Sequence, residues 1–280
     1  MTAATDSSTV LAGQAKLEVK LVSGQSAVTT SLASSPMKLL VPGWRGKSVG
    51  AFTSSFGGGL VAGDETLLDL HIGEHARCFL GTQASTKVYR NPSRRPCGHT
   101  TSASLGENSL LVLAPDPVQP FAHSTYSQRQ RVHLAAGAGL ALVDWFTAGR
   151  VARGERWEFT HFQSRNEVFC SNERIFLDAI LLRPGDGSLA SSHRAGRFNC
   201  FAMLLFVGPP VKAFAETILS NISRRPVERR ASLVASASPV RHGAVLRLAA
   251  ESVEQLGREL HQHLKPLTTL LGDDPWSRKW

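Results

Sequence analysis

The sequence predicts a mainly β protein, built of many short strands wound into a β-helical stack, with two α-helices in the C-terminal third. Three observations lead to this class. Apolar and polar residues alternate over much of the first two thirds, clusters of Gly, Pro, Asn and Asp separate the alternating runs, and helical spacing of apolar residues is found only in the last third. The alternation alone predicts strands; their winding into a stack comes from a resemblance given below.

Period-two alternation places one set of side chains on a core and the other set in solvent. It recurs along the chain in runs centred on Leu68/Leu70/Ile72, Ala76/Cys78/Leu80, Val132/Leu134, Leu140/Leu142 and Trp157/Phe159. Segments rich in Gly, Pro, Asn and Asp follow or separate these runs, and we interpret them as turns at 91–98, 114–118, 135–139 and 183–187. Residues 1–15 are small and polar, and we expect a disordered tail there.

The last third has a different pattern. Residues 198–207 form a continuous apolar run, typical of a strand buried on both faces. Two stripes at helical spacing then predict helices, the first opened by Pro209-Pro210 and the second by a Ser252/Gln255 capping box and closed by Pro266. We expect residues 16–280 to form one β-rich domain, with an α/β portion at about 198–272.

Charge and composition indicate which classes of function fit the chain. The chain carries a net charge of +9, which favours acidic partners. Its densest basic runs, 150–156 and 223–230, lack the interleaved aromatic residues of a single-strand nucleic-acid binder. The four cysteines form no CxxC pair, and no signal peptide or membrane-length apolar run is found. We therefore expect a cytoplasmic protein without disulfides, and no nucleic-acid or membrane partner.

Two segments imitate nucleotide-binding motifs. The glycine-rich segment 56–64 fits G-x-G-x-x-A, but the residues that follow it predict a strand where a dinucleotide site needs a helix. Residues 43–48 resemble the end of a P-loop, yet Val41 stands where its first glycine is required. No G-x-S-x-G or HExxH motif is present, and His71 and His75 on a strand are poorly spaced as co-ligands. These patterns argue against an enzyme.

Five blocks, in order, resemble the UreD (also called UreH) family of urease accessory proteins. They are FGGGLVAGD at 56–64, TQASTKVYR at 82–90, LAPDPVQPF at 113–121, LVDWFTAGRVARGERWEF at 142–159 and FLDAILL at 176–182. The residues that carry the first two blocks are Gly57, Gly58, Gly59, Gly63, Thr82, Gln83, Thr86, Lys87 and Tyr89. The resemblance extends over roughly residues 17–272.

The resemblance implies strands wound into a helical stack with a few helices, and no enzymatic turnover. It further implies a scaffold that binds apo-urease, recruits UreF and through it the GTPase UreG, and passes nickel toward the urease active site. Ni²⁺ would be transient, and no tightly bound cofactor is expected. Carboxylates in the family-like blocks either line the nickel path or form a structural cluster in which Arg150 pairs with Glu155 or Asp144; the candidates are Asp64, Asp144, Arg150, Glu155 and Asp178.

Two other classes stay open on the sequence alone. One is a β-rich enzyme with a scattered catalytic site, which would show turnover as an isolated protein. The other is a basic nucleic-acid-binding module, which would show a steep dependence of affinity on salt.

Overall fold

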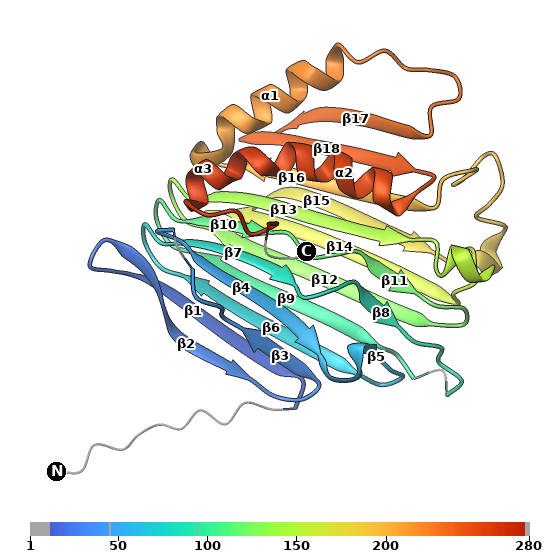
Figure 1. The fold of residues 1–280 in the computed structure, drawn as a ribbon, viewed down its shortest axis with the longest axis horizontal. Coiled ribbons are helices and arrows are strands. Elements are labelled where there is room, and N and C mark those ends of the chain that lie inside the picture. Colours follow the sequence, from blue (N-terminus) through green and yellow to red (C-terminus); the bar gives the residue numbers. More distant parts are fainter. Residues whose placement is uncertain (1–11, 45, 94, 278–280) are drawn as a thin grey trace.

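The chain winds through about four coils of a β-solenoid, and its strands form two large facing sheets (Figure 1). The computed structural model describes residues 12–44, 46–93 and 95–277. The coils are, in chain order, β4 (Val49–Ser55), β5 (Gly59–Leu60) and β6 (Glu65–Ile72); β7 (Arg77–Thr82), β8 (Thr86–Val88) and β9 (Gly98–Leu105); β10 (Leu110–Leu113), β11 (Val118–Pro120) and β12 (Thr125–Leu134); and β13 (Gly139–Thr147) with β14 (His161–Cys170).

Corresponding strands of successive coils pair in parallel. In the first sheet, called sheet A, β6, β9, β12 and β14 lie side by side; in the second, sheet B, β4, β7, β10 and β13 do so. The short strands β5, β8 and β11 form a third row at one side of the coils. Equivalent positions of each coil therefore stack on one another, which lines up residues far apart in sequence.

Antiparallel strands close the two ends of the solenoid. At the first end β1 (Gln14–Val22) pairs with β6 and β2 (Gln25–Ala33), and β3 (Met37–Leu40) pairs with β4. At the other end β15 (Glu173–Leu182) extends sheet A, and β16 (Cys200–Val207), β18 (Gly243–Ala250) and β17 (Leu233–Val240) extend sheet B.

Helices cover part of the outer face of sheet B (Figure 1). These are α1 (Lys212–Ser223), α2 (Val253–Leu264) and the short α3 (Thr268–Leu271), with 3₁₀ turns η1 (Phe56–Gly58), η2 (Val151–Arg153), η3 (Pro184–Asp186), η4 (Pro209–Val211) and η5 (Lys265–Leu267). One apolar cluster fills the space between the sheets, a second lies between sheet B and the helices, and a third lies beneath the row of short strands. The three clusters leave a polar interior layer between the first and the third.

Most expected elements are confirmed. The alternating residues Leu68, Leu70 and Ile72 are buried within β6, and the apolar run from 198 contains β16, buried along most of its length. Both expected helices form; the Ser252 hydroxyl accepts the Gln255 backbone N–H at the start of α2, while the Gln255 side chain bonds Ser232 instead of closing the capping box.

Three expectations need correction. Trp157 and Phe159 are buried as the alternation predicted, but they lie in an irregular loop and not in a strand, since Trp157 has φ of 59°. Pro266 ends α2 yet does not end the helical path, because a proline fits the first turn of the 3₁₀ segment η5 and α3 follows. Of the expected tail 1–15, residues 1–11 lie outside the described residues, and β1 already begins at Gln14, so residues 14 and 15 belong to the fold.

Candidate functional site: a polar layer inside the solenoid

Two interior rungs of sheet A are polar where their neighbours along the strands are apolar. The strand registers align Thr66, His99, Gln128 and Ser164 in one rung, and Thr101, Gln130, Asn166 and Asp178 in the next. The following rungs, through Ala103 and Leu105, return to the apolar core. The polar side chains thus run from strand to strand along the solenoid axis.

Sheet B contributes the opposite wall of the layer. Thr53 pairs in register with Thr82, and Asp144 and Arg247 occupy positions in register with Met203 on the strand between them. Asp144 follows the buried residues Leu140 and Leu142 at the same two-residue spacing, so its carboxylate points inward. The two sheets therefore face each other with polar side chains over this part of the interior.

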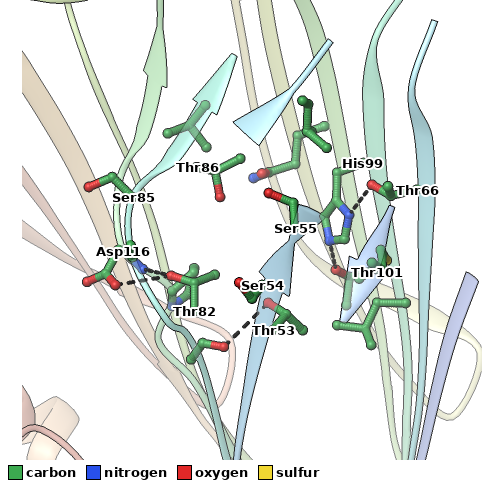
Figure 2. Close-up of a pocket in the computed structure, with 18 of the residues that line it drawn as sticks. Thr53, Ser54, Ser55, Thr66, Thr82, Ser85, Thr86, His99, Thr101 and Asp116 are labelled. Atoms are coloured by element: carbon green, nitrogen blue, oxygen red, sulfur yellow. Dashed lines mark hydrogen bonds between the residues drawn. The ribbon is translucent and has the colours of Figure 1, made fainter. Parts of the chain in front are cut away.

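A cavity with room for water of about 120 Å³ lies between these walls. Figure 2 shows His99 between Thr66 and Thr101 on one side, and Asp116 beside Thr82 on the other. Further hydroxyl side chains surround the same space, namely Thr53, Ser54, Ser55, Ser85 and Thr86. The cavity extends inward to Gln128, Gln130 and Asp144.

His99 is held in a neutral state by this environment. Its Nδ1 lies 2.8 Å from the Thr66 hydroxyl and its Nε2 lies 3.0 Å from that of Thr101. Some of its surface faces the cavity, but protein surrounds it, and burial lowers the pKa of the imidazole to about 4. A neutral imidazole is also the form that coordinates metal ions.

Asp144 is the centre of a hydrogen-bond network. Its Oδ1 accepts from Gln128 Nε2 at 3.0 Å, and its Oδ2 accepts from Asn166 Nδ2 at 2.7 Å and from the Ser164 hydroxyl. Burial raises the pKa of the Asp144 carboxyl, and these three donors oppose that effect. Within the described part of the chain, no arginine or lysine forms an ion pair with this buried carboxylate.

The layer continues to Asp178 and ends at the protein surface. A second hollow, of about 80 Å³, is lined by both Asp144 and Asp178 and by Arg247. Asp178 Oδ1 lies 2.6 Å from Arg247 NH2, and the Arg247 side chain is 51% exposed. Asp144 lines both hollows, so it joins the larger cavity to this edge of the molecule.

The two glycine- and threonine-rich blocks meet at the other end of the larger cavity. Gly57 and Gly58 have φ of 74° and 70°, a backbone conformation that favours glycine, and β5 pairs with β8 beside them. The Tyr89 hydroxyl donates to the Gly57 carbonyl at 3.0 Å. Gly58, Leu60, Thr82 and Thr86 of these blocks line the cavity. Gln83, which follows Thr82, donates its backbone N–H to the Thr53 carbonyl at 2.8 Å.

The remaining sequence candidates lie outside the polar layer. Asp64 Oδ2 accepts the Val61 backbone N–H at 2.9 Å, which closes the turn containing Gly63. Glu155 forms an ion pair with Arg150, and its Oε2 accepts the Ala122 backbone N–H at 3.1 Å. The structure thus brings Asp144 and Asp178 together and places Asp64, Arg150 and Glu155 in loop contacts.

Most residues of the polar layer were not among the candidates predicted from the sequence. Gln128, Gln130, Ser164, Asn166, Thr66, His99 and Thr101 occupy the buried phase of alternating strands. Along each strand these polar residues share the inward face with apolar residues. This interruption of the apolar pattern is the signal in the sequence that could have identified the layer.

Within the described residues, no group of three or more His, Cys, Asp or Glu side chains is placed to hold a metal ion. His71 bonds Ser104 on the outer face of sheet A, and His75 lies in the turn after β6. The cysteines Cys78, Cys97, Cys170 and Cys200 are all free thiols. No helix in the described part of the chain is long and apolar enough to cross a membrane.

The family model and the relatives that match this chain carry the same description. A family model described as UreD urease accessory protein matches residues 12–280. The chain is 46% identical over 272 residues to a protein named urease accessory protein UreD from Sorangium cellulosum, covering 96% of this chain and 85% of that one. It is 31% identical to urease accessory protein D of Arabidopsis thaliana, covering 94% of this chain and 99% of the plant protein.

Proposed function

The chain belongs to the UreD family of urease accessory proteins, and from this membership we propose that it is a urease maturation scaffold. In this proposal it docks on apo-urease, recruits UreF and the GTPase UreG, and helps to deliver nickel to the urease active site in the cytoplasm. The family match over nearly the whole chain is the observation that carries the proposal.

The proposed role requires no turnover by this chain and no tightly bound cofactor. Ni²⁺ is cargo, taken up and released. A carrier of that kind needs oxygen and imidazole ligands that exchange readily, since a closed site with three or four thiolates would retain the ion. The polar layer fits this requirement, because it offers carboxylates, hydroxyls, amide oxygens and one neutral imidazole along a path between the sheets.

Each part of the layer has a distinct proposed task. Asp116 and the hydroxyls around Thr82 would receive the ion near the glycine-rich turn, and His99 would offer a neutral nitrogen ligand. Asp144 would bind next, its carboxylate already oriented by Gln128, Ser164 and Asn166. The raised pKa of Asp144 fits this task, since burial disfavours the charged carboxylate and a bound cation would stabilise it.

Asp178 would control the far end of the path. Its pairing with Arg247 neutralises the carboxylate in the absence of cargo. The exposed position of Arg247 allows the guanidinium to move toward solvent when a cation arrives.

The test is urease activation in a defined mixture of apo-urease, UreF, UreG, nickel and bicarbonate, with and without this protein. The variants are Asp144→Asn in the layer and Asp69→Asn at an exposed position on the outer face of β6, in sheet A. We expect activation only when the protein is present. Asp144→Asn should slow activation about tenfold, as removal of a metal-orienting group does, and Asp69→Asn should not.

The thermal unfolding midpoint of each variant must be measured together with urease activation, so that a loss of fold is not mistaken for a loss of nickel passage through the layer. Equal activation without the protein would overturn the scaffold role and favour the enzyme alternative. Normal activation by a folded Asp144→Asn variant would leave the scaffold role in place but would show that nickel does not pass through the polar layer.

A further inference from the structure

The outer face of sheet A changes character across its strands. Next to β1 the charges are mixed, with Lys16 and Glu18 forming an ion pair and Asp69 in register beside Lys16. On β9 the outward side chains are small and hydroxylated, through Thr100, Ser102 and Ser104. On β12, β14 and β15 the face becomes strongly basic, and it is this region that we call the arginine face.

Three of the four arginines on the strands of the arginine face surround one carboxylate. Arg131, Arg165 and Arg174 place NH atoms 3.5, 2.9 and 3.2 Å from Glu167, whose side chain is only 4% exposed. Arg129 stands in register with Arg165 and forms no ion pair within the described part of the chain. Glu167 is the one acidic residue at the outward positions of β12, β14 and β15, all of which are described.

The cluster therefore carries more positive than negative charge. Among the described residues, the buried Arg165 Nε atom has no hydrogen-bond partner, and Glu167 Oε2 accepts no hydrogen bond, with Arg131 3.5 Å away. A guanidinium has five donors in a planar fork that matches a carboxylate, and buried donors without partners are costly. Carboxylates brought by another molecule would pair with the exposed guanidinium groups of Arg129, Arg131 and Arg174 and balance the charge.

An apolar edge adjoins the arginine face. Leu177 and Leu181 on β15 are 41% and 50% exposed, and they stand in register with Glu167 and Gln163 of β14. β15 is also the last strand of sheet A, so one side of its backbone is not paired in the sheet. Charged rows beside exposed leucines are typical of protein interfaces, in which apolar contacts accompany electrostatic complementarity.

The same region is poorly suited to a nucleic acid. Single-stranded nucleic acids need aromatic faces on which bases can stack. The aromatic ring of this face, Phe169, already stacks on His133 at 4.8 Å and 10°, and the Arg131 guanidinium lies 5.7 Å from its centre. Exposed leucines likewise give a phosphate backbone nothing to bind.

From these features we infer that the arginine face, with Leu177 and Leu181, is a docking surface for an acidic protein surface that presents apolar residues beside its carboxylates. The inference rests on the proposed function only for naming apo-urease, UreF and UreG as the proteins to test. The proposed docking surface is separate from the proposed nickel path, because the arginine face lies on the opposite side of sheet A from the polar layer.

The experiment compares two double variants that remove the same charge. Arg129→Gln/Arg131→Gln alters the arginine face, and Arg229→Gln/Arg230→Gln alters the exposed loop before β17. Binding is measured to a fluorescent poly-L-glutamate, to a single-stranded RNA of equal charge, and to apo-urease, UreF and UreG. We expect the first variant to lose about tenfold in affinity for polyglutamate and for one protein, and the second to lose less than about twofold.

A third variant, Leu177→Ser/Leu181→Ser, should weaken binding of that protein and leave polyglutamate binding unchanged. Equal losses in the two arginine variants would overturn the inference, since bulk charge would then be the cause. Tighter binding of RNA than of polyglutamate through the same arginines would also overturn it. If polyglutamate behaves as expected but none of the three urease proteins binds the unaltered chain, the proposed function fails and the acidic-partner surface stands.

Discussion

The Tyr89 hydroxyl donates a hydrogen bond to the carbonyl oxygen of Gly57 and so joins two sequence blocks that are 32 positions apart at these residues. β5 and β8 pair next to this bond, and a side chain at Gly59 would meet the Lys87 carbonyl oxygen at 2.6 Å and the Tyr89 ring at 2.7 Å. The glycines and the tyrosine therefore form one unit at the mouth of the polar cavity. Their joint presence in the sequence has a structural reason.

Gly59→Ala should destabilise the fold by about 2 kcal/mol, because backbone on the neighbouring coil must move to admit a methyl group. Gly57→Ala is the matched control: its φ is 74°, but nothing lies within 4 Å of the added atom, so only the backbone strain of about 1 kcal/mol applies. Urea denaturation of both variants measures the difference. Equal losses would mean that the close approach to β8 is not a tight contact.

His99 makes stability depend on pH in a defined window. Its pKa is about 4 in the fold and 6.5 as a free side chain, so between these values the unfolded chain binds more protons. Stability supplied by the neutral imidazole is complete above 6.5 and is lost as pH falls toward 4. His99→Gln retains groups that can bond Thr66 and Thr101 but does not titrate. Its unfolding midpoint should fall less between pH 7 and 4.5 than that of the unaltered protein; parallel curves would contradict this assignment.

The strands and helices could be predicted because they follow from local periodicity. The buried phase of β6 and the apolar stripe of α2 depend on residues only a few positions apart. The irregular loop at Trp157 could not be predicted, because alternating burial also occurs in irregular chain segments. The turn there packs Trp157 against Phe159 of the same loop and against Phe201 of β16, which is distant in sequence.

The polar layer could not be predicted from the sequence for a related reason. Asp144 stood out in the sequence as a carboxylate among apolar residues, but its partners come from the facing sheet, Gln128 from the preceding coil and Asn166 from the next strand of its own coil. Only the strand register places them together, and register depends on the winding of the solenoid. Gln128 and Gln130 in the buried phase between Tyr126 and Val132 were a local sign that this interior is not entirely apolar.

The ion pair of Arg150 and Glu155 should stabilise the loop before β14 without taking part in nickel passage. Glu155 also accepts the Ala122 N–H, so Glu155→Gln should cost about 1–2 kcal/mol through weakened charged hydrogen bonds. Urease activation per folded molecule should equal that of the unaltered protein. A selective loss of activation at unchanged stability would instead place Glu155 on the nickel path.

Glu167→Gln separates stability from binding at the arginine face. The hydrogen bond from Arg165, with the charges of Arg165 and Arg131 and a further bond from Arg174, lowers the pKa of the Glu167 carboxyl to about 2 from its ordinary 4.5. Stability from this carboxylate is present above 4.5 and is lost as pH falls through 2. The variant should therefore unfold at lower temperature at pH 7, with a difference that narrows in acid.

The same substitution removes the only carboxylate from the outward positions of β12, β14 and β15, all described, so affinity for poly-L-glutamate should rise about twofold while stability falls. Glu251→Gln is the control, because Glu251 follows β18 of sheet B and pairs with Arg197, so the substitution removes an equal charge away from the arginine face. It should change polyglutamate affinity less. A variant that merely unfolded would lose both properties together, and an equal gain in the two variants would show that net charge, and not the arginine face, determines binding of acidic ligands.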